Sequence, residues 1–593
     1  MRNCRGFALL AVSLAAGAVW AQEFRATLTG RVVDPSDAPI VDASITVKNE
    51  GTNVAYPAKT DSRGNYTVAF LPPGEYSATA SAPGFRPAVR SGLPLSVAQA
   101  ATQDFKLEIG AVTQEVTVSA EAPLLEQTNG DRGGLIDAEA VTEYPLNGRN
   151  PFMLSMLVPG VDYNGELVYQ RPFDNGAIAR WNINGSNANN EFLLDGAPNN
   201  AQAGTNNIAY VPPVDSVAEF KIQTNSYDAQ YGKSAGGIVN VALKSGGNRV
   251  HGTVYEFARR NALDTNSFQN NSRGAPKEGH YLDQFGTQLD GPLYLPKIYD
   301  GRNRTFFLFN YEGYREGTPQ PLVLSVPEPD MRNGDFSKLL DGAGRLITVF
   351  DPTTTARGAD GVYRRTPFPG NIISKDRINP IARKIVDFYP LPNTKTAGVA
   401  YAQQNYFASG GANPAKDRFY NLVFKFDQNF GTRHRAFFRH GSNDRTEMRS
   451  TNGILDKPGA DGPQPLKRIN DAYVLDWVTM LSPSMILNPR VSFSRYLYSN
   501  DAVVAKKFEM TSLGFPASLA ASLPYNPGFG RYALDEYLTL GKAGASKDVT
   551  NTWVIAASLT KISGTHTTKA GYDARWIQYA YQNTGTVFQL SGN

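Results

Sequence analysis

Alternating apolar and polar residues dominate the chain from residue 249 onward. Such alternation predicts β-strands with one apolar and one polar face. A soluble sheet with one wet face and the wall of a membrane barrel both show it. Several segments reach the roughly 9–11 residues that cross a bilayer, which favours the barrel. The clearest predicted strands are residues 306–311, 420–427, 433–441, 470–481, 485–498, 550–562 and 566–579.

Residues 1–21 predict a signal peptide for export. Arg2 and Arg5 precede an apolar run from Phe7 to Val19, and a plausible cleavage point lies before Gln22. This run is too short to span a bilayer as an anchor, and no later stretch approaches the roughly 18 apolar residues that a spanning helix needs. An exported chain that stays in a membrane without such a helix needs a closed barrel, because lipid offers backbone N–H and C=O groups no partners.

Two smaller folded regions are expected between the signal peptide and the long strands. Residues 22–109 predict a β-sandwich, because short strands alternate with turns rich in Pro, Gly and Asp. Residues 110–120 form a hinge with one extended segment, and residues 121–248 predict a compact α/β region. The expected sandwich strands are 27–33, 44–49, 64–70, 74–80 and 102–107, and the expected helices of the second region are 137–143 and 151–157, the latter with Asn150 as N-cap.

A long Pro/Gly-rich loop is predicted at about 318–418, between two of the long strands. One short helix is expected inside it, with Asn379 as N-cap and Pro380 as its first residue. A structured loop of this length is usually functional.

Motifs in residues 24–108 resemble the carboxypeptidase regulatory-like domain. They are Gly30-Arg31-Val32, the turn from Asp61 to Tyr66 and the loop from Leu71 to Tyr76. The resemblance implies a transthyretin-like or carbohydrate-binding-like sandwich. It names an accessory domain, so it does not imply peptidase activity.

The motifs that follow resemble TonB-dependent outer-membrane receptors of the Oar-like type. They are Leu194-Asp195-Gly196, Val217–Phe220, Gly236–Val241, Gln284–Gly286 and Arg332–Phe336. The resemblance implies a plug domain at 121–248. It also implies that residues 249–593 are the N-terminal part of a transmembrane antiparallel β-barrel, with the loop at about 318–418 outside the cell. The implied partners are a TonB-type energy-transducing protein in the periplasm, an extracellular small ligand or oligosaccharide, and the lipid and lipopolysaccharide of the outer membrane.

Two groups of residues are candidate binding sites under this resemblance. The first is a TonB box, an extended segment that adds a strand to a partner's sheet. Its alternatives are the last strand of the sandwich or a plain linker. The second is a set of plug residues near the ligand, although asparagine-rich segments also form turns that satisfy themselves by Asx hydrogen bonds. The box residues are Glu115, Val116, Thr117, Val118 and Ser119, and the ligand set is Asn187, Asn189, Asn190, Asp195, Asn199 and Asn200.

Composition argues against several other functions. The formal charge is +4, which falls to +2 without Arg2 and Arg5, so no nucleic-acid partner is expected. Cys4 is the only cysteine and lies in the signal peptide, so no thiolate nucleophile is expected. The five histidines have no metal-ligand spacing, and neither a phosphate-binding Gly-rich loop nor a nucleophile elbow occurs. We therefore expect no catalytic residue, no metal, no cofactor and no enzyme activity.

The favoured hypothesis is an outer-membrane receptor that imports its ligand with energy from the TonB system. The alternative is an outer-membrane adhesion or carbohydrate-binding protein that uses the barrel as an anchor. About nine strands are clear after residue 248, whereas plugged transporters have about 22. We therefore expect the sequence to be truncated at its C-terminal side.

Overall fold

The computed structural model shows a mainly β protein with few helices, and strands account for 52% of the chain. This confirms the mainly β class expected from the sequence, whereas the predicted signal peptide lies outside the described residues. In the described part of the chain, no helix combines the length and the apolarity needed to cross a membrane. The structure describes residues 23–110, 116–119, 130–163, 171–173, 181–186, 190–201, 207–232, 234–319, 321–408, 415–449, 454, 459, 464–500, 508–523, 528–541, 546–564, 566–583 and 589–592.

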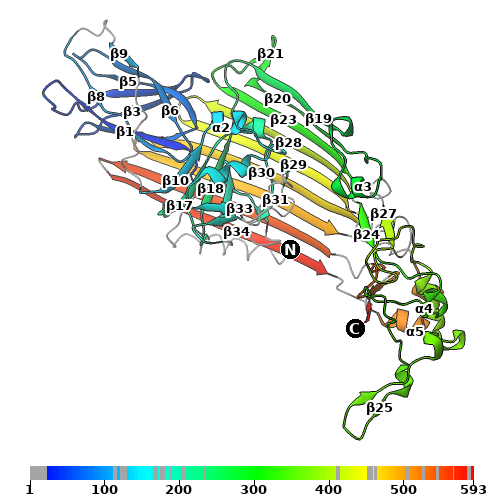
Figure 1. Cartoon of the computed structure of the whole chain (residues 1–593). Coiled ribbons are helices and arrows are strands. Elements are labelled where there is room, and N and C mark those ends of the chain that lie inside the picture. The colour runs from blue at the N-terminus through cyan, green and yellow to red at the C-terminus, as the bar shows by residue number, and fades with distance from the viewer. Residues whose placement is uncertain are drawn as a thin grey trace.

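Two sheets form the sandwich, which lies at one end of the long strands (Figure 1). One has the order β4-β1-β7, with β8 also paired to β1, and the other has the order β3-β2-β5-β6-β9. The inward-facing residues of both sheets share one buried core. The strands are β1 Ala26–Val33, β2 Ser44–Asn49, β3 Ala55–Lys59, β4 Asn65–Leu71, β5 Gly74–Ser81, β6 Ala88–Leu95, β7 Ala100–Thr102, β8 Phe105–Lys106 and β9 Val116–Ser119.

The strand expected at 102–107 is instead two short strands, β7 and β8. Both pair in parallel with β1, at Thr27–Thr29 and at Val32–Val33. Between them the side chain of Asp104 accepts a hydrogen bond from the Arg31 N–H at 2.7 Å, in place of a backbone acceptor. The backbones approach so closely here that a Cβ on Gly30 would collide with the carbonyl oxygen of Gln103, so only glycine fits.

The α/β region expected to be the plug, and called the plug below, is built on a five-stranded sheet with the order β10-β17-β18-β13-β14, in which β13 and β18 are parallel. Both expected helices are present. Asp137 caps the first, and Asn150 caps the second, which is a 3-10 helix. The elements are β10 Arg132–Ile136, α2 Ala138–Glu143, η2 Pro151–Leu157, β11 Val161–Tyr163, β12 Trp181–Ile183, β13 Glu191–Leu194, β14 Ala197–Pro198, β15 Asn200–Ala201, β16 Asn207–Ile208, η5 Val214–Ser216, β17 Val217–Asn225 and β18 Ile238–Leu243.

Nine long antiparallel strands form one sheet, against which the plug lies (Figure 1). Neighbours in the sheet follow one another along the chain, and no described strand pairs with the outer edge of β19 or of β34. This open sheet, called the wall below, has the number of strands counted in the sequence. The strands are β19 His251–Arg260, β20 Tyr281–Pro292, β23 Thr305–Thr318, β28 Ala415–Phe430, β29 His434–Arg449, β30 Gln464–Ser482, β31 Met485–Asn500, β33 Ser546–Ser563 and β34 His566–Asn583.

The two faces of this wall differ as the alternation predicts. On β23, Phe307 and Phe309 lie toward the outer face, whereas Leu308 and Asn310 are buried toward the plug. Large apolar side chains therefore face outward, as lipid contact requires. The inner face is polar but is covered by the plug in this structure. Its fully buried members include Asn310, Glu312, Asn421, Lys425, Arg439, Asn470, Asp476 and Arg490.

Small elements connect the wall strands near β19 and β20. A short helix and a two-stranded hairpin lie in these connections. They are η6 Asn261–Leu263, α3 Phe268–Ser272, β21 Tyr294–Leu295 and β22 Tyr299–Asp300.

The long connections of the wall form a folded lobe at the end of the strands opposite the sandwich (Figure 1). Residues from two loops and from residue 454 share one core around Phe529 and Leu540. The helix expected at Asn379–Pro380 is present, and Asn379 accepts from the N–H groups of Ile381 and Ala382. The elements are β24 Leu322–Leu324, η7 Met331–Asn333, η8 Pro352–Thr354, β25 Ala356–Arg357, β26 Tyr363–Arg364, η9 Pro369–Asn371, η10 Lys375–Arg377, α4 Pro380–Val386, β27 Tyr406–Ala408, η12 Met510–Leu513, α5 Ala517–Ser522, β32 Arg531–Leu534 and β35 Gln589–Gly592.

We expect Gly30→Ala to destabilise the sandwich by about 1–3 kcal/mol, the usual cost of overpacking a close-packed site. Pulse proteolysis of the full chain in increasing urea measures this change. Gly279→Ala is the control, because a Cβ at Gly279 meets no atom within 4 Å. Identical urea midpoints for cleavage of the sandwich in the two variants would contradict the expected clash.

Candidate functional site

The candidate site is the seam where the plug meets the inner face of the wall. One turn of the plug, between β13 and β14, places Asp195 in this seam with a left-handed backbone (φ 47°). The turn is held because the Asp195 N–H donates to the carbonyl of Val241 at 2.9 Å, and Asp195 Oδ1 accepts from the Leu243 N–H at 3.0 Å. Asp195 is fully buried.

Two cations of the wall face this carboxylate. Lys425 Nζ on β28 lies 3.4 Å from Asp195 Oδ1, and Arg439 Nη1 on β29 lies 3.3 Å from Oδ2. Both cations are as buried as the carboxylate. Charges taken out of water are tolerated when they are paired, so this triad ties the plug to two neighbouring wall strands.

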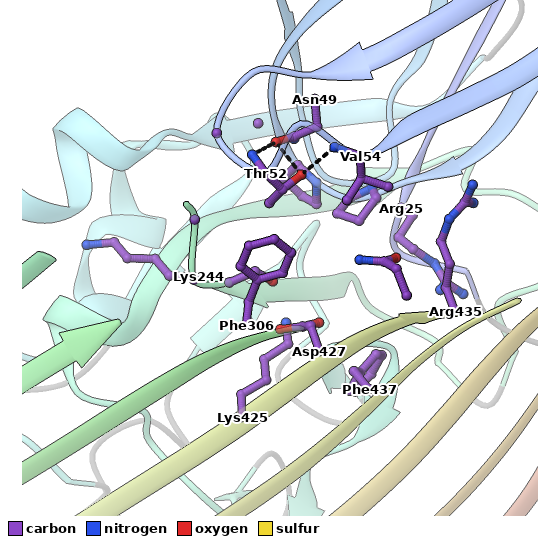
Figure 2. A pocket seen from close by; sticks show the side chains of 18 of the residues that line it. Arg25, Asn49, Thr52, Val54, Lys244, Phe306, Lys425, Asp427, Arg435 and Phe437 are labelled. Atoms are coloured by element: carbon purple, nitrogen blue, oxygen red, sulfur yellow. Dashed lines mark hydrogen bonds between the residues drawn. The ribbon is translucent and has the colours of Figure 1, made fainter. Parts of the chain in front are cut away.

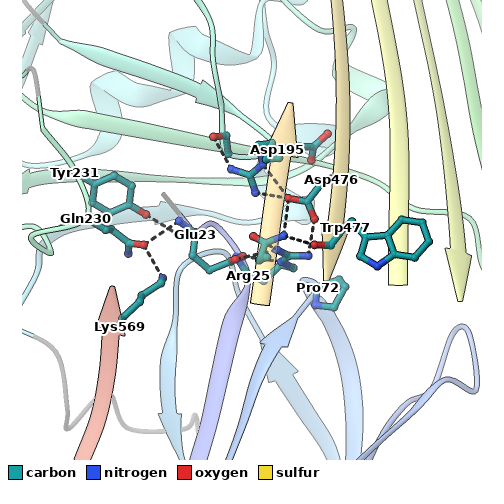
Figure 3. A network of polar contacts seen from close by, with 12 residues as sticks. Glu23, Arg25, Pro72, Asp195, Gln230, Tyr231, Asp476, Trp477 and Lys569 are labelled. Atoms are coloured by element: carbon teal, nitrogen blue, oxygen red, sulfur yellow. Dashed lines mark hydrogen bonds and ion pairs between the residues drawn. The ribbon is translucent and has the colours of Figure 1, made fainter. Parts of the chain in front are cut away.

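A second polar network joins the wall to the next residue of the plug turn (Figure 3). Arg490 on β31 donates to the carbonyl of Gly196 at 2.7 Å and pairs with Asp476 on β30 at 2.8 Å. Gly196 has φ 73°, and a Cβ there would collide with the Arg490 guanidinium. The Leu-Asp-Gly motif therefore has two structural roles. Asp195 supplies the carboxylate that pairs with Lys425 and Arg439, and Gly196 leaves room for the guanidinium of Arg490.

The same network continues into the segment that precedes the sandwich. Arg25 pairs with Asp476 at 3.1 Å and with Glu23 at 2.6 Å, all with buried side chains. Burial favours the neutral acid at Glu23, but Arg25 together with the charges of Lys569 and Arg490 outweighs this effect, so the pKa of Glu23 is lowered. Glu23 is therefore an anion at neutral pH.

Two further ion pairs bind the plug to the two sides of the wall. Glu191 on β13 pairs with Arg575 on β34 at 2.6 Å. Arg171 pairs with Glu316 on β23 at 2.8 Å. Ionic contacts thus reach from β23 to β34, nearly the full width of the sheet.

The plug also contacts the sandwich through Glu219 on β17. The Glu219 carboxylate accepts a hydrogen bond from the Val97 N–H in the turn between β6 and β7. Burial raises the pKa of Glu219 to about 7, against the opposing effect of this hydrogen bond. Lys221, two residues on, donates to the carbonyl of Ala98 in the same turn at 3.3 Å.

The asparagines predicted to bind ligand are used inside the plug. Asn190 accepts from the Gly237 N–H at 3.0 Å, and Asn199 forms a pair of bonds with the Tyr210 backbone, at 2.7 and 3.0 Å. Asn200 accepts from the Phe192 N–H at 3.1 Å. These contacts agree with the self-satisfied alternative, and ligand binding by these residues stays a prediction. Asn187 and Asn189 lie outside the described residues.

Residues 116–119 of the predicted TonB box form β9, which pairs in parallel with β6 of the sandwich. This is the placement that the alternative interpretation, a last strand of the sandwich, describes. β9 stands at the end of its sheet, so one of its edges has no described partner strand. TonB binding by this segment stays a prediction, and Glu115 lies outside the described residues.

A cavity of about 390 Å³ lies between the sandwich, the end of the plug and the wall (Figure 2). Sandwich residues 49–54 and 72–75 line one side, and plug residues 243–247 line another. The wall contributes Phe306 and Phe437 together with Lys425, Asp427 and Arg435. Among the described residues no group of His, Cys, Asp and Glu could hold a metal ion.

Family comparison identifies the long-stranded region. Residues 242–593 match the family model described as outer membrane beta barrel domain. The chain belongs to this outer-membrane β-barrel family. Residues 27–108 match the carboxypeptidase regulatory-like domain, as the sequence motifs predict.

A curated relative of this barrel protein is the TonB-dependent transporter Oar of Myxococcus xanthus. It is 26% identical over 301 residues, which cover 50% of this chain and 28% of the relative. The chain thus spans less than a third of the relative's length. The match confirms the Oar-like resemblance, and with the family it assigns the protein to the outer membrane. The relative's name describes a transporter.

Two solved structures are similar to this barrel protein at low identity. The outer membrane transporter YddB from Escherichia coli is 10% identical with a TM-score of 0.43, covering 75% of this chain and 48% of that one. The siderophore receptor PirA from Acinetobacter baumannii is 11% identical with a TM-score of 0.41, covering 77% and 49%.

Sequence reasoning missed several members of the seam. Asp476 and Arg490 lie at polar positions of strands in which polar and apolar residues alternate. A charged residue on the inward-facing side of such a strand is a signal that could have identified them. Arg25 carries no such signal, because Asp476 lies in a distant strand, and the same holds for the backbone contacts of Glu23 to Gln230 and Tyr231. Asp195 was found, but for its place in a motif and not for its ion pairs.

We expect Asp195→Asn to weaken the seating of the plug by about 3–5 kcal/mol, because two buried cations lose their only anion in the triad. Urea unfolding of the purified full chain, followed by protease cleavage within the plug, measures the change. Asp162→Asn on the exposed strand β11 is the matched control, since its side chain lies at the surface. Equal effects of the two substitutions would show that the buried triad does not hold the plug.

The contact at Glu219 predicts a dependence of stability on pH. Its pKa of about 7 lies above the ordinary 4.5, so the folded protein keeps this proton over a range where the unfolded chain has released it. The contribution is fully present below pH 4.5 and is lost as the pH rises through 7, by at most about 3 kcal/mol. Unfolding free energies of wild type and Glu219→Gln between pH 5 and 8 test this. A wild-type curve parallel to that of Glu219→Gln would exclude it.

Proposed function

We propose that this protein is a receptor and transporter that binds a ligand at the cell surface and imports it with energy from a TonB-type protein. The observation that carries this proposal is the seam itself. A plug lies against the inner face of an outer-membrane wall and is held there by ion pairs and hydrogen bonds to five strands, β23, β28, β29, β31 and β34. Such polar contacts are exchangeable with water, so a plug of this kind suits repeated opening.

The energy source is proposed from β9 and from the relative's name. An exposed strand edge is a template for strand addition, in which main-chain hydrogen bonds supply the affinity. β9 offers one edge without a described partner, at the end of the sheet β3-β2-β5-β6-β9. It also lies on the sandwich side of the seam, away from the lobe (Figure 1). A periplasmic partner would therefore reach it without entering the barrel.

The ligand is proposed to meet the lobe first and the plug next. The lobe has its own apolar core, so it is a folded surface and not a set of separate loops. A small ligand or an oligosaccharide is proposed, as for the Oar-like type. The adhesion alternative would need the sandwich at the cell surface, whereas the sandwich lies at the end of the wall opposite the lobe (Figure 1). That arrangement favours the transporter.

We expect deletion of residues 115–119 in the full-length protein to abolish energised uptake and to leave cell-surface binding unchanged. The reason is that TonB coupling and ligand recognition use opposite ends of the molecule. A growth screen on siderophores and oligosaccharides, in a host without its own receptors, supplies the ligand. Binding and accumulation are then measured with that labelled compound.

Deletion of residues 121–125 is the matched control, since it removes five residues close to the box in the sequence and spares the box itself. Loss of both binding and uptake, or of neither, after deletion of 115–119 would reject the proposed function.

A further inference from the structure

The three residues that precede β1 are buried in the seam and not on the sandwich. Glu23, Phe24 and Arg25 are 8%, 4% and 8% exposed. A glutamate and an arginine are rarely buried unless they are paired, so this segment is held by specific partners. Each of the three residues contacts a different set of neighbours.

Arg25 joins the sandwich to the wall. Its guanidinium reaches Asp476 on β30 at 3.1 Å and Asn488 on β31 at 3.0 Å, and Glu23 completes its hydrogen bonds. Asp476 and Asn488 are themselves bonded at 3.1 Å. The Arg25 charge is therefore fixed to two adjacent wall strands (Figure 3).

Glu23 joins the sandwich to the plug through its backbone. The Glu23 N–H donates to Gln230 Oε1 at 2.8 Å, and its carbonyl accepts from the Tyr231 hydroxyl at 2.9 Å. Gln230 Oε1 also accepts from Lys569 on β34 at 2.8 Å. One plug side chain is thus shared between the segment and the far side of the wall.

Phe24 fills the apolar gap between these polar contacts. Its ring packs edge-on against Phe437 of the wall, with centroids 6.3 Å apart. Val97 of the sandwich turn, Ala242 of the plug and Val474 of the wall belong to the same buried cluster. All three parts of the molecule therefore meet at one phenylalanine.

Elsewhere the junction between the sandwich and the wall is uneven. Phe70 of the sandwich packs with Val478 and Ile486 of the wall in one buried cluster, and Arg435 lies 3.8 Å from the centroid of the Tyr56 ring. The cavity of about 390 Å³ lies beside these contacts, and Phe24 and Arg25 line it together with the sandwich turns and the wall (Figure 2). At the rim, Asn53 bonds Asn303 at 3.1 Å with both residues exposed. Surface hydrogen bonds and an open cavity contribute little cohesion, because few atoms are in contact across them. The segment 23–25 with the turn at Val97 is the part of the junction where buried residues of the sandwich, the plug and the wall meet.

We infer that residues 23–25 are a lock that holds the sandwich against the plug and wall as a second, inner closure of the barrel. Opening the seam then requires the sandwich to undock, which breaks the contacts of Arg25 and Phe24. This inference rests on the proposed function, in which the plug must move. The inference assigns a gating role to the sandwich. It also identifies β9, which belongs to the same sandwich, as the strand on which force from the TonB-type protein would act.

A cysteine at Val97 reports the lock, because Val97 is fully buried between Phe24 and the wall. The purified full chain carrying Val97→Cys and lacking Cys4 is labelled with a maleimide dye. We expect Arg25→Met to raise the labelling rate about tenfold or more, since leaving Asp476 and Glu23 short of a buried cation costs more than the free energy of a tenfold shift. Arg31→Met, at an exposed position on β1, is the control and should leave the rate unchanged.

A second cysteine shows whether the sandwich itself stays folded. Val47→Cys lies fully buried in the sandwich core and away from the seam. The lock predicts that Arg25→Met leaves this cysteine protected. Labelling of both cysteines would mean that Arg25 stabilises the sandwich fold, and labelling of neither would mean that Arg25 does not hold the junction. Either result overturns the inference.

Labelling of the same Val97→Cys protein in living cells tests whether opening of the lock depends on the proton-motive force. We expect periplasmic labelling to fall severalfold when a protonophore is added, and to fall equally when residues 115–119 are deleted. If both treatments leave labelling unchanged while they still reduce ligand uptake, the gating role is overturned and the proposed function stays intact. If both treatments leave ligand uptake unchanged, the proposed function is rejected instead.

Discussion

The fold depends on one constraint, which is that charged side chains buried between the plug and the wall need partners. Asp195 and Asp476 are buried and are paired with arginine or lysine from distant parts of the chain, and the buried Glu23 is paired with Arg25, two residues away. An unpaired charge in such a place would be strongly unfavourable, so the plug has few alternative positions against the wall. The apolar plug core, which includes Leu308 and Val423 of the wall, supplies cohesion but little direction.

This constraint also explains why the seam suits a moving part. Ion pairs between two bodies give orientation more than net affinity, because each pair loses hydration when it forms. Under the proposed function, a plug held in this way would return to one position after displacement, and water would replace its contacts during the movement. The sandwich adds a third body to the same network through Arg25, so the inner end of the barrel and the plug are mechanically connected.

The sequence predicted most of the elements and part of the site. Alternation located β28, β29, β30, β31, β33 and β34, because side chains on successive residues of a strand face opposite sides. Local signals located the caps at Asn150 and Asn379. The strand at 102–107 was wrong, because β7 and β8 divide where Asp104 replaces a backbone acceptor. Tertiary contact decided this division, and no local pattern records it.

The sequence by itself determined the class of protein, the alternation of the wall and the turn residues, because each depends on neighbours within a few positions. Only the tertiary structure decided which charges meet. Arg25 and Asp476 are 451 residues apart, and Asp195 and Arg439 are 244 apart. It also decided that Asn190 and Asn199 bond to the plug's own backbone and that β9 joins the sandwich. The sequence around a charged or amide side chain does not indicate which residue it pairs with, because the pairing follows from how the sheets pack.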